Sequence, residues 1–179
     1  MTDIERTQLQ YPIGKAVLSD TLTPEERVAH ITTIEMAPGK IRKAVEGLNS
    51  EQLDTPYRPE GWTVRQVVHH MPDSHMNSYV RFRWALTEED PMIKAYDEKG
   101  WAMLPDGLLG PIGVSLRLLD ALHARWAALL RNMKEDDFAR TLQHPEGRTY
   151  TLDKMLGLYA WHCEHHIAHI TSLRARNGW

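Results

Sequence analysis

Residues 151–169 read Thr-Leu-Asp-Lys-Met-Leu-Gly-Leu-Tyr-Ala-Trp-His-Cys-Glu-His-His-Ile-Ala-His, a run in which a helical apolar repeat leads into a group of histidines. At about 100° per residue, positions 162, 165, 166 and 169 project from one side of a helix. His162 and His166 lie one turn apart and can converge on a single ion, and neutral imidazole is the commonest protein ligand for zinc and related metals. This stretch therefore predicts a helix that supplies two ligands to a metal.

Two ligands do not hold a metal, and a second histidine-rich run supplies candidates for the third. Residues 69–75 read His-His-Met-Pro-Asp-Ser-His, within an apolar repeat that predicts a helix starting at Thr63, whose side chain can cap it. Pro72 lies inside this helix, and we expect a bend close to His70 because proline removes a hydrogen bond and clashes with the preceding turn. His69 and His70 point about 100° apart, and geometry alone does not choose between them.

The apolar repeats along the chain predict four long helices and little strand. We expect these helices at about residues 23–48, 63–86, 114–133 and 151–177. Pro38 and Gly39 should kink or break the first of them. An all-α fold follows, and four such helices in one domain spanning residues 1–179 suggest a four-helix bundle, a fold that builds metal sites from side chains on facing helices.

Two connections between the helices carry further expectations. The crossover between the second and third helices, residues 87–113, is long for a compact domain, and its aromatic residues Tyr96 and Trp101 favour an ordered lid or interface. Residues 143–150, which include His-Pro-Glu-Gly-Arg, predict a turn or small hairpin.

Length and composition exclude several classes of protein. A chain of 179 residues builds a core that needs no disulfide or metal to hold it, so a bound metal is expected to serve function. A formal net charge of -3 without any basic block argues against nucleic acid and anionic membranes as partners. Cys163, the single cysteine, excludes an intrachain disulfide and multi-cysteine zinc sites, and is expected to be a small buried hydrophobe. Without a long apolar run or a signal-peptide pattern, we expect a soluble, cytoplasmic protein.

Several motifs together resemble one family. They are Gly-Trp-Thr-Val-Arg-Gln-Val-Val-His-His at 61–70, Asp-Ser-His-Met-Asn-Ser-Tyr at 73–79, Tyr-Asp-Glu-Lys at 96–99 and Trp-His-x-x-His-His-Ile-Ala-His-Ile at 161–170. Nearly the whole chain is similar to the YfiT-like metal-dependent hydrolases of the DinB superfamily. The resemblance implies a DinB-like four-helix bundle that forms a homodimer and binds one divalent metal per chain, zinc first and nickel second.

The resemblance also implies a ligand set. In that family three histidines hold the metal, one just before an apolar-x-Asp sequence on the second helix and two as an i, i+4 pair on the fourth. Carried over residue by residue, this selects His70, His162 and His166. The chain departs from the family at Pro72, where relatives commonly have alanine, and the departure leaves the local helix geometry open.

Other polar residues near the expected ligands have less certain roles. Asp73, one turn beyond His70, is a candidate for orienting a ligand imidazole or for acting as a base, and Asn77 is a weaker candidate on the same face. His165 and His169 either support the ligands or contact substrate, or they simply pack or face solvent.

Three histidines around a metal leave a coordination position open, which is typical of catalytic rather than structural zinc sites. We therefore expect a metal-dependent hydrolase that acts on a small-molecule substrate by activating water or the substrate. A close alternative is a low-molecular-weight thiol S-transferase of the bacillithiol type, which would use the same metal to activate the thiol. A non-catalytic metal-binding stress protein is a further alternative. The sequence leaves the substrate and the physiological metal open.

Overall fold

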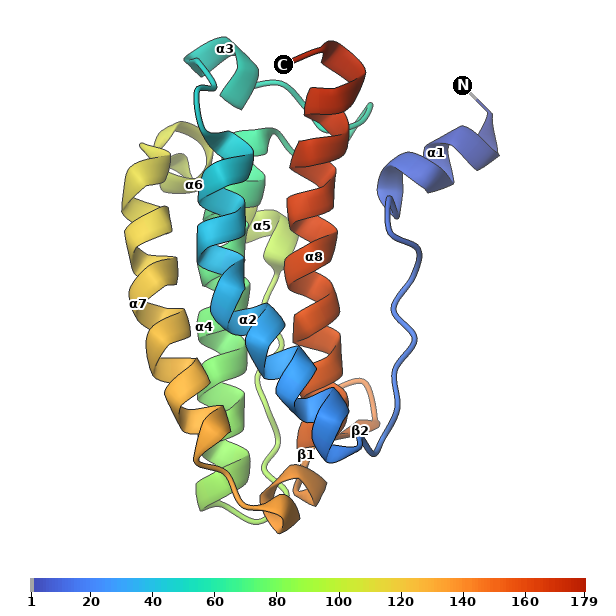
Figure 1. Ribbon diagram of the computed structural model, residues 1–179, viewed down its shortest axis with the longest axis vertical. Helices are drawn as coiled ribbons and strands as arrows, with labels where there is room; N and C mark the ends of the chain where they lie inside the picture. Colours follow the sequence, from blue (N-terminus) through green and yellow to red (C-terminus); the bar gives the residue numbers. More distant parts are fainter. Residues whose placement is uncertain (1) are drawn as a thin grey trace.

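Four long helices form the body of the protein, whose computed structural model describes residues 2–179 (Figure 1). They are α2 (Pro24–Val45), α4 (Val64–Thr87), α7 (Ile112–Arg131) and α8 (Leu152–Asn177). Both α2 and α4 pack against α7 and α8, and they enclose one apolar core that includes Ile34, Phe82 and Trp126, all without exposed surface. This arrangement confirms the predicted all-α four-helix bundle. No helix among the described residues combines the length and the apolar character needed to cross a membrane.

Side chains before the long helices fix where these helices begin. Thr23 and Thr63 each accept a hydrogen bond from the backbone three residues later, and the residue in that position returns a bond to the cap. Thr151 accepts a bond from the Lys154 backbone at the start of α8, and Gly178 ends the helix in the left-handed conformation with φ of 69°. The boundaries of α4 and α8 therefore follow the signals in the sequence closely.

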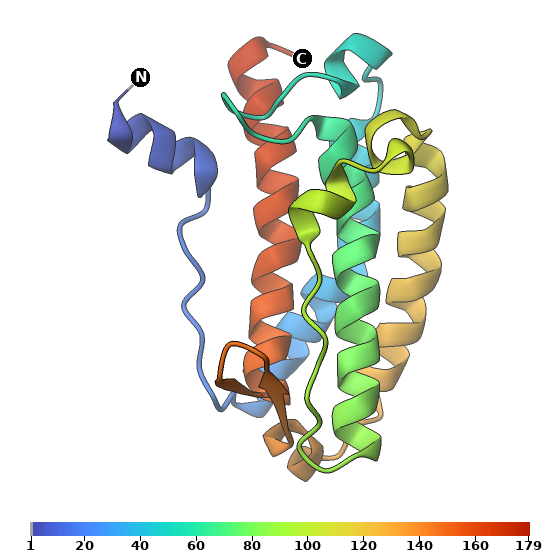
Figure 2. The same ribbon diagram turned by 180° about the vertical axis from the view of Figure 1, so that it is seen from behind.

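Two prolines lie inside long helices without ending them. Of the kink or break expected at Pro38 and Gly39, the break does not occur, because α2 continues through Pro38, and the helix changes direction along its length (Figures 1 and 2). The α4 helix passes through Pro72 and appears nearly straight in Figure 2, so the marked bend expected near His70 is not seen. Because proline has no N–H, Pro38 leaves the carbonyl of Ile34, four residues earlier, without its usual helical donor.

The shorter elements lie outside the bundle, and most of them escaped the sequence prediction. A hairpin of β1 (Thr141–His144) and β2 (Arg148–Thr151) confirms the turn expected at residues 143–150. The helical turns that were missed are too short to show an apolar repeat. They are α1 (Asp3–Gln10), α3 (Ser50–Leu53), α5 (Glu98–Ala102), α6 (Pro105–Leu109) and the 3-10 helix η1 (Glu135–Ala139).

The crossover between α4 and α7 is ordered and lies against the bundle, where it contains α5 and α6 (Figure 2). Gln66 on α4 donates a side-chain hydrogen bond of 2.8 Å to the carbonyl of Ala102 in α5. Further back, the Ile93 N–H donates to the carbonyl of Gln143 in β1 at 2.9 Å. These bonds hold the crossover beside α4, as expected for an ordered lid.

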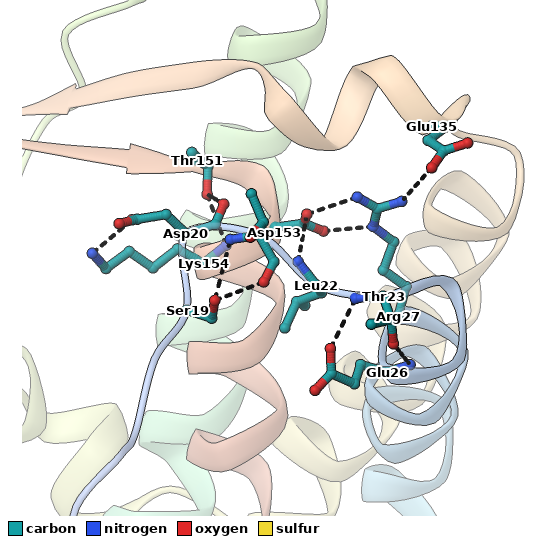
Figure 3. A network of polar contacts seen from close by, with 11 residues as sticks. Ser19, Asp20, Leu22, Thr23, Glu26, Arg27, Glu135, Thr151, Asp153 and Lys154 are labelled. Atoms are coloured by element: carbon teal, nitrogen blue, oxygen red, sulfur yellow. Dashed lines mark hydrogen bonds and ion pairs between the residues drawn. The ribbon is translucent and has the colours of Figure 1, made fainter.

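A buried ion pair fastens the N-terminal part of the chain to α8 (Figure 3). Asp153 has 1% of its surface exposed, and its carboxylate accepts hydrogen bonds from Arg27 Nε at 2.7 Å and Nη2 at 2.8 Å. The same carboxylate accepts a bond of 2.9 Å from the Leu22 N–H, and Thr151 donates to the carbonyl of Asp20 at 2.7 Å. Residues 11–23, which connect α1 to α2, are thereby fixed at one end of α8.

We expect Asp153→Ala to lower the free energy of unfolding by about 3 kcal/mol, because it leaves the partly buried Arg27 side chain, 14% exposed, without its main partner. Chemical denaturation measures the change. The control is Asp120→Ala, which breaks an exposed pair with Arg42 and should change stability by less than about 1 kcal/mol. Equal losses in the two variants would show that burial of the Arg27 pair is not what stabilises this end of the bundle.

Candidate metal centre

Three histidines on two facing helices bring their ring nitrogens together in the middle of the bundle. His70 lies on α4, His162 and His166 lie one turn apart on α8, and one nitrogen from each falls within 4.8 Å of the other two. The Nε2 atoms of His70 and His162 are 3.3 Å apart. Zinc bonds of about 2.0–2.1 Å at tetrahedral angles place neighbouring nitrogens about 3.4 Å apart. The donor set therefore fits a small divalent metal, and these are the residues that the family resemblance selected as ligands.

Burial keeps these three imidazoles in the form that binds metal. His70 and His166 have 4% and 7% of their surface exposed. Desolvation lowers the pKa of His70 to about 4, and it also lowers the pKa of His162 and His166 well below the ordinary value. Neighbouring histidines lower each pKa further by repelling a second positive charge. All three rings are therefore neutral at pH 7, as metal ligation requires.

The surroundings of His69 and His70 differ, and they favour His70 as the ligand. The Nδ1 atom of His69 lies 2.7 Å from the hydroxyl of Ser115 on α7, and its Nε2 lies 3.1 Å from the carbonyl of Gly110. Since the carbonyl only accepts, Nε2 carries the proton and Nδ1 accepts from the hydroxyl. Both nitrogens of His69 are thus engaged on the α7 side, while His70 faces α8.

A histidine, and not a carboxylate, contacts the second nitrogen of His162. The Nε2 atom of His75 lies 2.9 Å from His162 Nδ1. Asp73 is half-buried, and burial followed by repulsion from Asp106 raises its pKa to about 6. Within residues 2–179 its carboxylate makes no hydrogen bond with the three histidines, and Asn77 bonds only to the Asp73 backbone carbonyl, at 2.8 Å. A role for Asp73 as base or orienting group therefore stays a prediction.

His165 and His169 lie beside the three histidines and are tied to other parts of the chain. The ring of His165 stacks on Trp161 with centroids 4.2 Å apart. His169 stacks on Tyr57 at 3.8 Å, and its Nε2 donates to the carbonyl of Gln10 at 3.0 Å. Their Nδ1 atoms are buried and have no hydrogen-bond partner within residues 2–179. These two rings therefore pack the site and anchor the N-terminal segment over it.

A cleft of about 590 Å³ opens onto the three histidines. Trp62 and Trp161 both line it, Trp62 with its ring centroid 4.6 Å from that of His70 and Trp161 stacked on His165. The crossover contributes Glu98, Lys99 and Met103 to the lining, and its role as a lid or interface stays a prediction. The charged and polar residues that line the cleft away from the histidines are Gln10, Tyr11, Arg58, Glu60, Gln66, Glu98 and Lys99.

The fold and the histidine cluster can now be set beside known proteins. A sequence model of the DinB superfamily matches residues 33–170 of this chain. The chain belongs to the DinB superfamily.

Its relatives in the superfamily match over nearly their whole length. The chain is 51% identical over 172 residues to a Bacillus subtilis protein named "Putative metal-dependent hydrolase YfiT", which covers 96% of this chain and 97% of the relative. It is 53% identical over 171 residues to a protein of the same description from Bacillus cereus, covering 96% and 98%. The solved structure of Bacillus subtilis YfiT, described as having "an unusual four-helix bundle topology", superposes with a TM-score of 0.94 at 50% identity, over 96% of this chain and 99% of that one.

His75 contacts His162, and His123 lies behind it in contact with His75, but the sequence predicts no specific role for either. His75 lies in the histidine-rich run on α4, and His123 lies on α7. Both are almost without exposed surface, at 0% and 1%. A signal was present for His123, because it follows Leu119 by one turn on the apolar face of α7 and precedes Trp126 on that face. A polar ring in such a stripe needs a hydrogen-bond partner in the core.

Buried neutral histidines make the stability of the metal-free protein depend on pH. Burial lowers the pKa of His123 to about 4 from an ordinary value of 6.5. Between these values the unfolded chain binds a proton that the folded chain does not, so stability falls as pH falls from 6.5 towards 4. His123 alone should contribute a loss of about 2 kcal/mol between pH 7 and pH 5. Denaturant unfolding with a chelator present measures this, and a constant or rising stability over that range would contradict it.

Proposed function

We propose that this protein is a hydrolase that uses one divalent metal, zinc or alternatively nickel, held by His70, His162 and His166. The observation that carries the proposal is the convergence of three neutral ring nitrogens within 4.8 Å at the floor of an open cleft. The description of the Bacillus relatives as metal-dependent hydrolases supports it. A divalent ion held by three imidazoles supplies Lewis-acid activation of water or of a substrate oxygen at its open position.

The residues of this chain do the remaining work of binding and orientation. The two ligands on α8 and the one on α4 come from rigid helices, so their separation is set before any substrate arrives. Trp62 and Trp161 give the cleft apolar walls, while Arg58, Glu60 and Lys99 offer charges of both signs to a small polar substrate. Asp73, one turn beyond His70 and with a pKa that burial raises to about 6, is retained as a proposed base or orienting group.

Transfer of a low-molecular-weight thiol to an electrophile is the second candidate. A cleft of about 590 Å³ has room for more than water and one small substrate, and its lining carries both cationic and anionic side chains that suit a charged cosubstrate. In this reaction the metal would favour the thiolate, which is the nucleophilic form. Assembly as a homodimer stays a prediction from the family resemblance.

Metal content tests the proposed ligands directly. We expect the purified protein to bind one zinc or nickel ion per chain, and His162→Ala to lose nearly all of it because two imidazoles hold a metal weakly. Elemental analysis after dialysis measures the content. His30→Ala, which removes a half-buried histidine on α2 that does not line the cleft, is the control and should bind metal as the unchanged protein does. An unchanged protein that takes up no ion on titration would sink the proposal.

Activity assays separate the two reactions. We expect cleavage of a small ester or amide without added thiol, lost on treatment with a chelator and restored by zinc or nickel. His162→Ala should reduce the rate to background, and His30→Ala should retain it. If cleavage is absent but a thiol is consumed together with an electrophile in a metal-dependent way that His162→Ala abolishes, transfer replaces hydrolysis as the function.

A further inference from the structure

A continuous line of hydrogen-bonded histidines runs from the core of the bundle to the proposed metal. The Nδ1 atom of His123 lies 2.6 Å from the carbonyl oxygen of Ile34 on α2. Its Nε2 lies 2.6 Å from His75 Nδ1, and His75 Nε2 lies 2.9 Å from His162 Nδ1. The line therefore crosses from α2 through α7 and α4 to α8, using one side chain from each of the last three helices.

The carbonyl at the start of this line fixes the direction of every bond in it. A carbonyl only accepts, so Nδ1 of His123 carries the proton and Nε2 has a free lone pair. His75 must then donate from Nδ1 and accept at Nε2, and His162 must donate from Nδ1. The remaining nitrogen of His162, Nε2, is left with its lone pair, and this is the atom 3.3 Å from His70 Nε2.

Pro38 explains why that carbonyl is available. In a regular helix the N–H of residue 38 would bond to the oxygen of residue 34, and proline has no N–H. Ile34 is fully buried, so an unbonded carbonyl there would be unfavourable. The Nδ1–H of His123 is the donor that replaces it.

The inner part of the line is closed off from solvent. His75 and His123 expose 0% and 1% of their surface. Trp126 and Tyr159 make edge-to-face contacts with His75, with ring centroids 5.9 Å and 5.4 Å apart. Water is therefore excluded from the bond between His123 and His75, whereas His162 is half-buried and lines the cleft.

We propose that His123 and His75 are positioning residues that, starting from the Ile34 carbonyl, lock His162 in the Nδ1–H tautomer and aim its Nε2 lone pair at the metal. Ligating histidines commonly donate their other N–H to a carboxylate, carbonyl or water, which fixes the tautomer and the ring orientation. Here the acceptor for the His162 N–H is the neutral ring of His75. The tautomer of His75 is fixed by His123, and that of His123 is fixed by the carbonyl of Ile34. The consequence for metal binding rests on the proposed function, but the tautomer itself does not.

The tautomers can be measured without any metal. We expect long-range proton–nitrogen NMR spectra of the metal-free protein, labelled with ¹⁵N-histidine at pH 7, to show His162, His75 and His123 each protonated at Nδ1. His75→Phe and His123→Phe assign the signals. A proton on Nε2 of His162, or a mixture of tautomers in the unchanged protein, would overturn the proposal.

The effect on metal affinity tests whether the line acts as a unit. Each of His75→Phe and His123→Phe should weaken zinc binding by about 10–100-fold in competition with a chromophoric chelator, and His123→Phe should give a tautomer mixture at His162. The double variant should bind zinc no more weakly than His75→Phe, because His123 acts only through His75. Losses that add together would mean that the rings only pack, and would contradict the proposal.

The controls separate this proposal from the proposed function. His30→Ala should leave both the tautomers and the zinc affinity unchanged. If the unchanged protein binds no zinc but shows the expected Nδ1–H pattern, the metal site fails and the hydrogen-bonded line stands. If it binds zinc while His162 carries its proton on Nε2 in the metal-free state, the line fails and the metal site stands.

Discussion

A buried imidazole needs an acceptor for its N–H, and that requirement organises the centre of this protein. His69 finds the carbonyl of Gly110 in the crossover, His123 finds that of Ile34 on α2, and His169 finds that of Gln10 beside the N-terminal helix. Each bond joins segments far apart in the sequence, and in a desolvated core its loss would be unfavourable. These histidines thus attach the outer segments to the bundle, in addition to any role in binding metal.

The sequence predicted the parts of the site that depend on local spacing. His162 and His166 share a helix face whatever surrounds them, and the caps at Thr63 and Thr151 set the helix starts. Whether His70 or His69 faces the other two histidines depends on the partners that tertiary packing offers each ring. Local spacing does not predict this, and the sequence favoured His70 only through the family resemblance. His123 bonds to the carbonyl of Ile34, which Pro38 leaves without its helical donor. His123 and Ile34 are 89 positions apart in the sequence, so no local pattern indicates this bond.

The bundle and the outer segments contribute different parts of the site. The proposed ligands and the residues behind them lie on the long helices, which are packed on a common core. The rest of the cleft comes largely from the crossover and the two segments that precede α2 and α4. Loops tolerate substitution better than packed helices do.

The attachment of the N-terminal segment to α8 bears on how the chain folds during synthesis. Asp153, which bonds to Arg27 and Leu22, lies at the start of α8. Arg27 and Leu22 therefore cannot form these bonds until a residue 126 and 131 positions later has been synthesised. His162 and His166 follow later still. Contacts so distant in sequence form late, and the segments that await them stay exposed in the meantime. On the ribosome, the bundle can close and its histidines can meet only after α8 has left the exit tunnel.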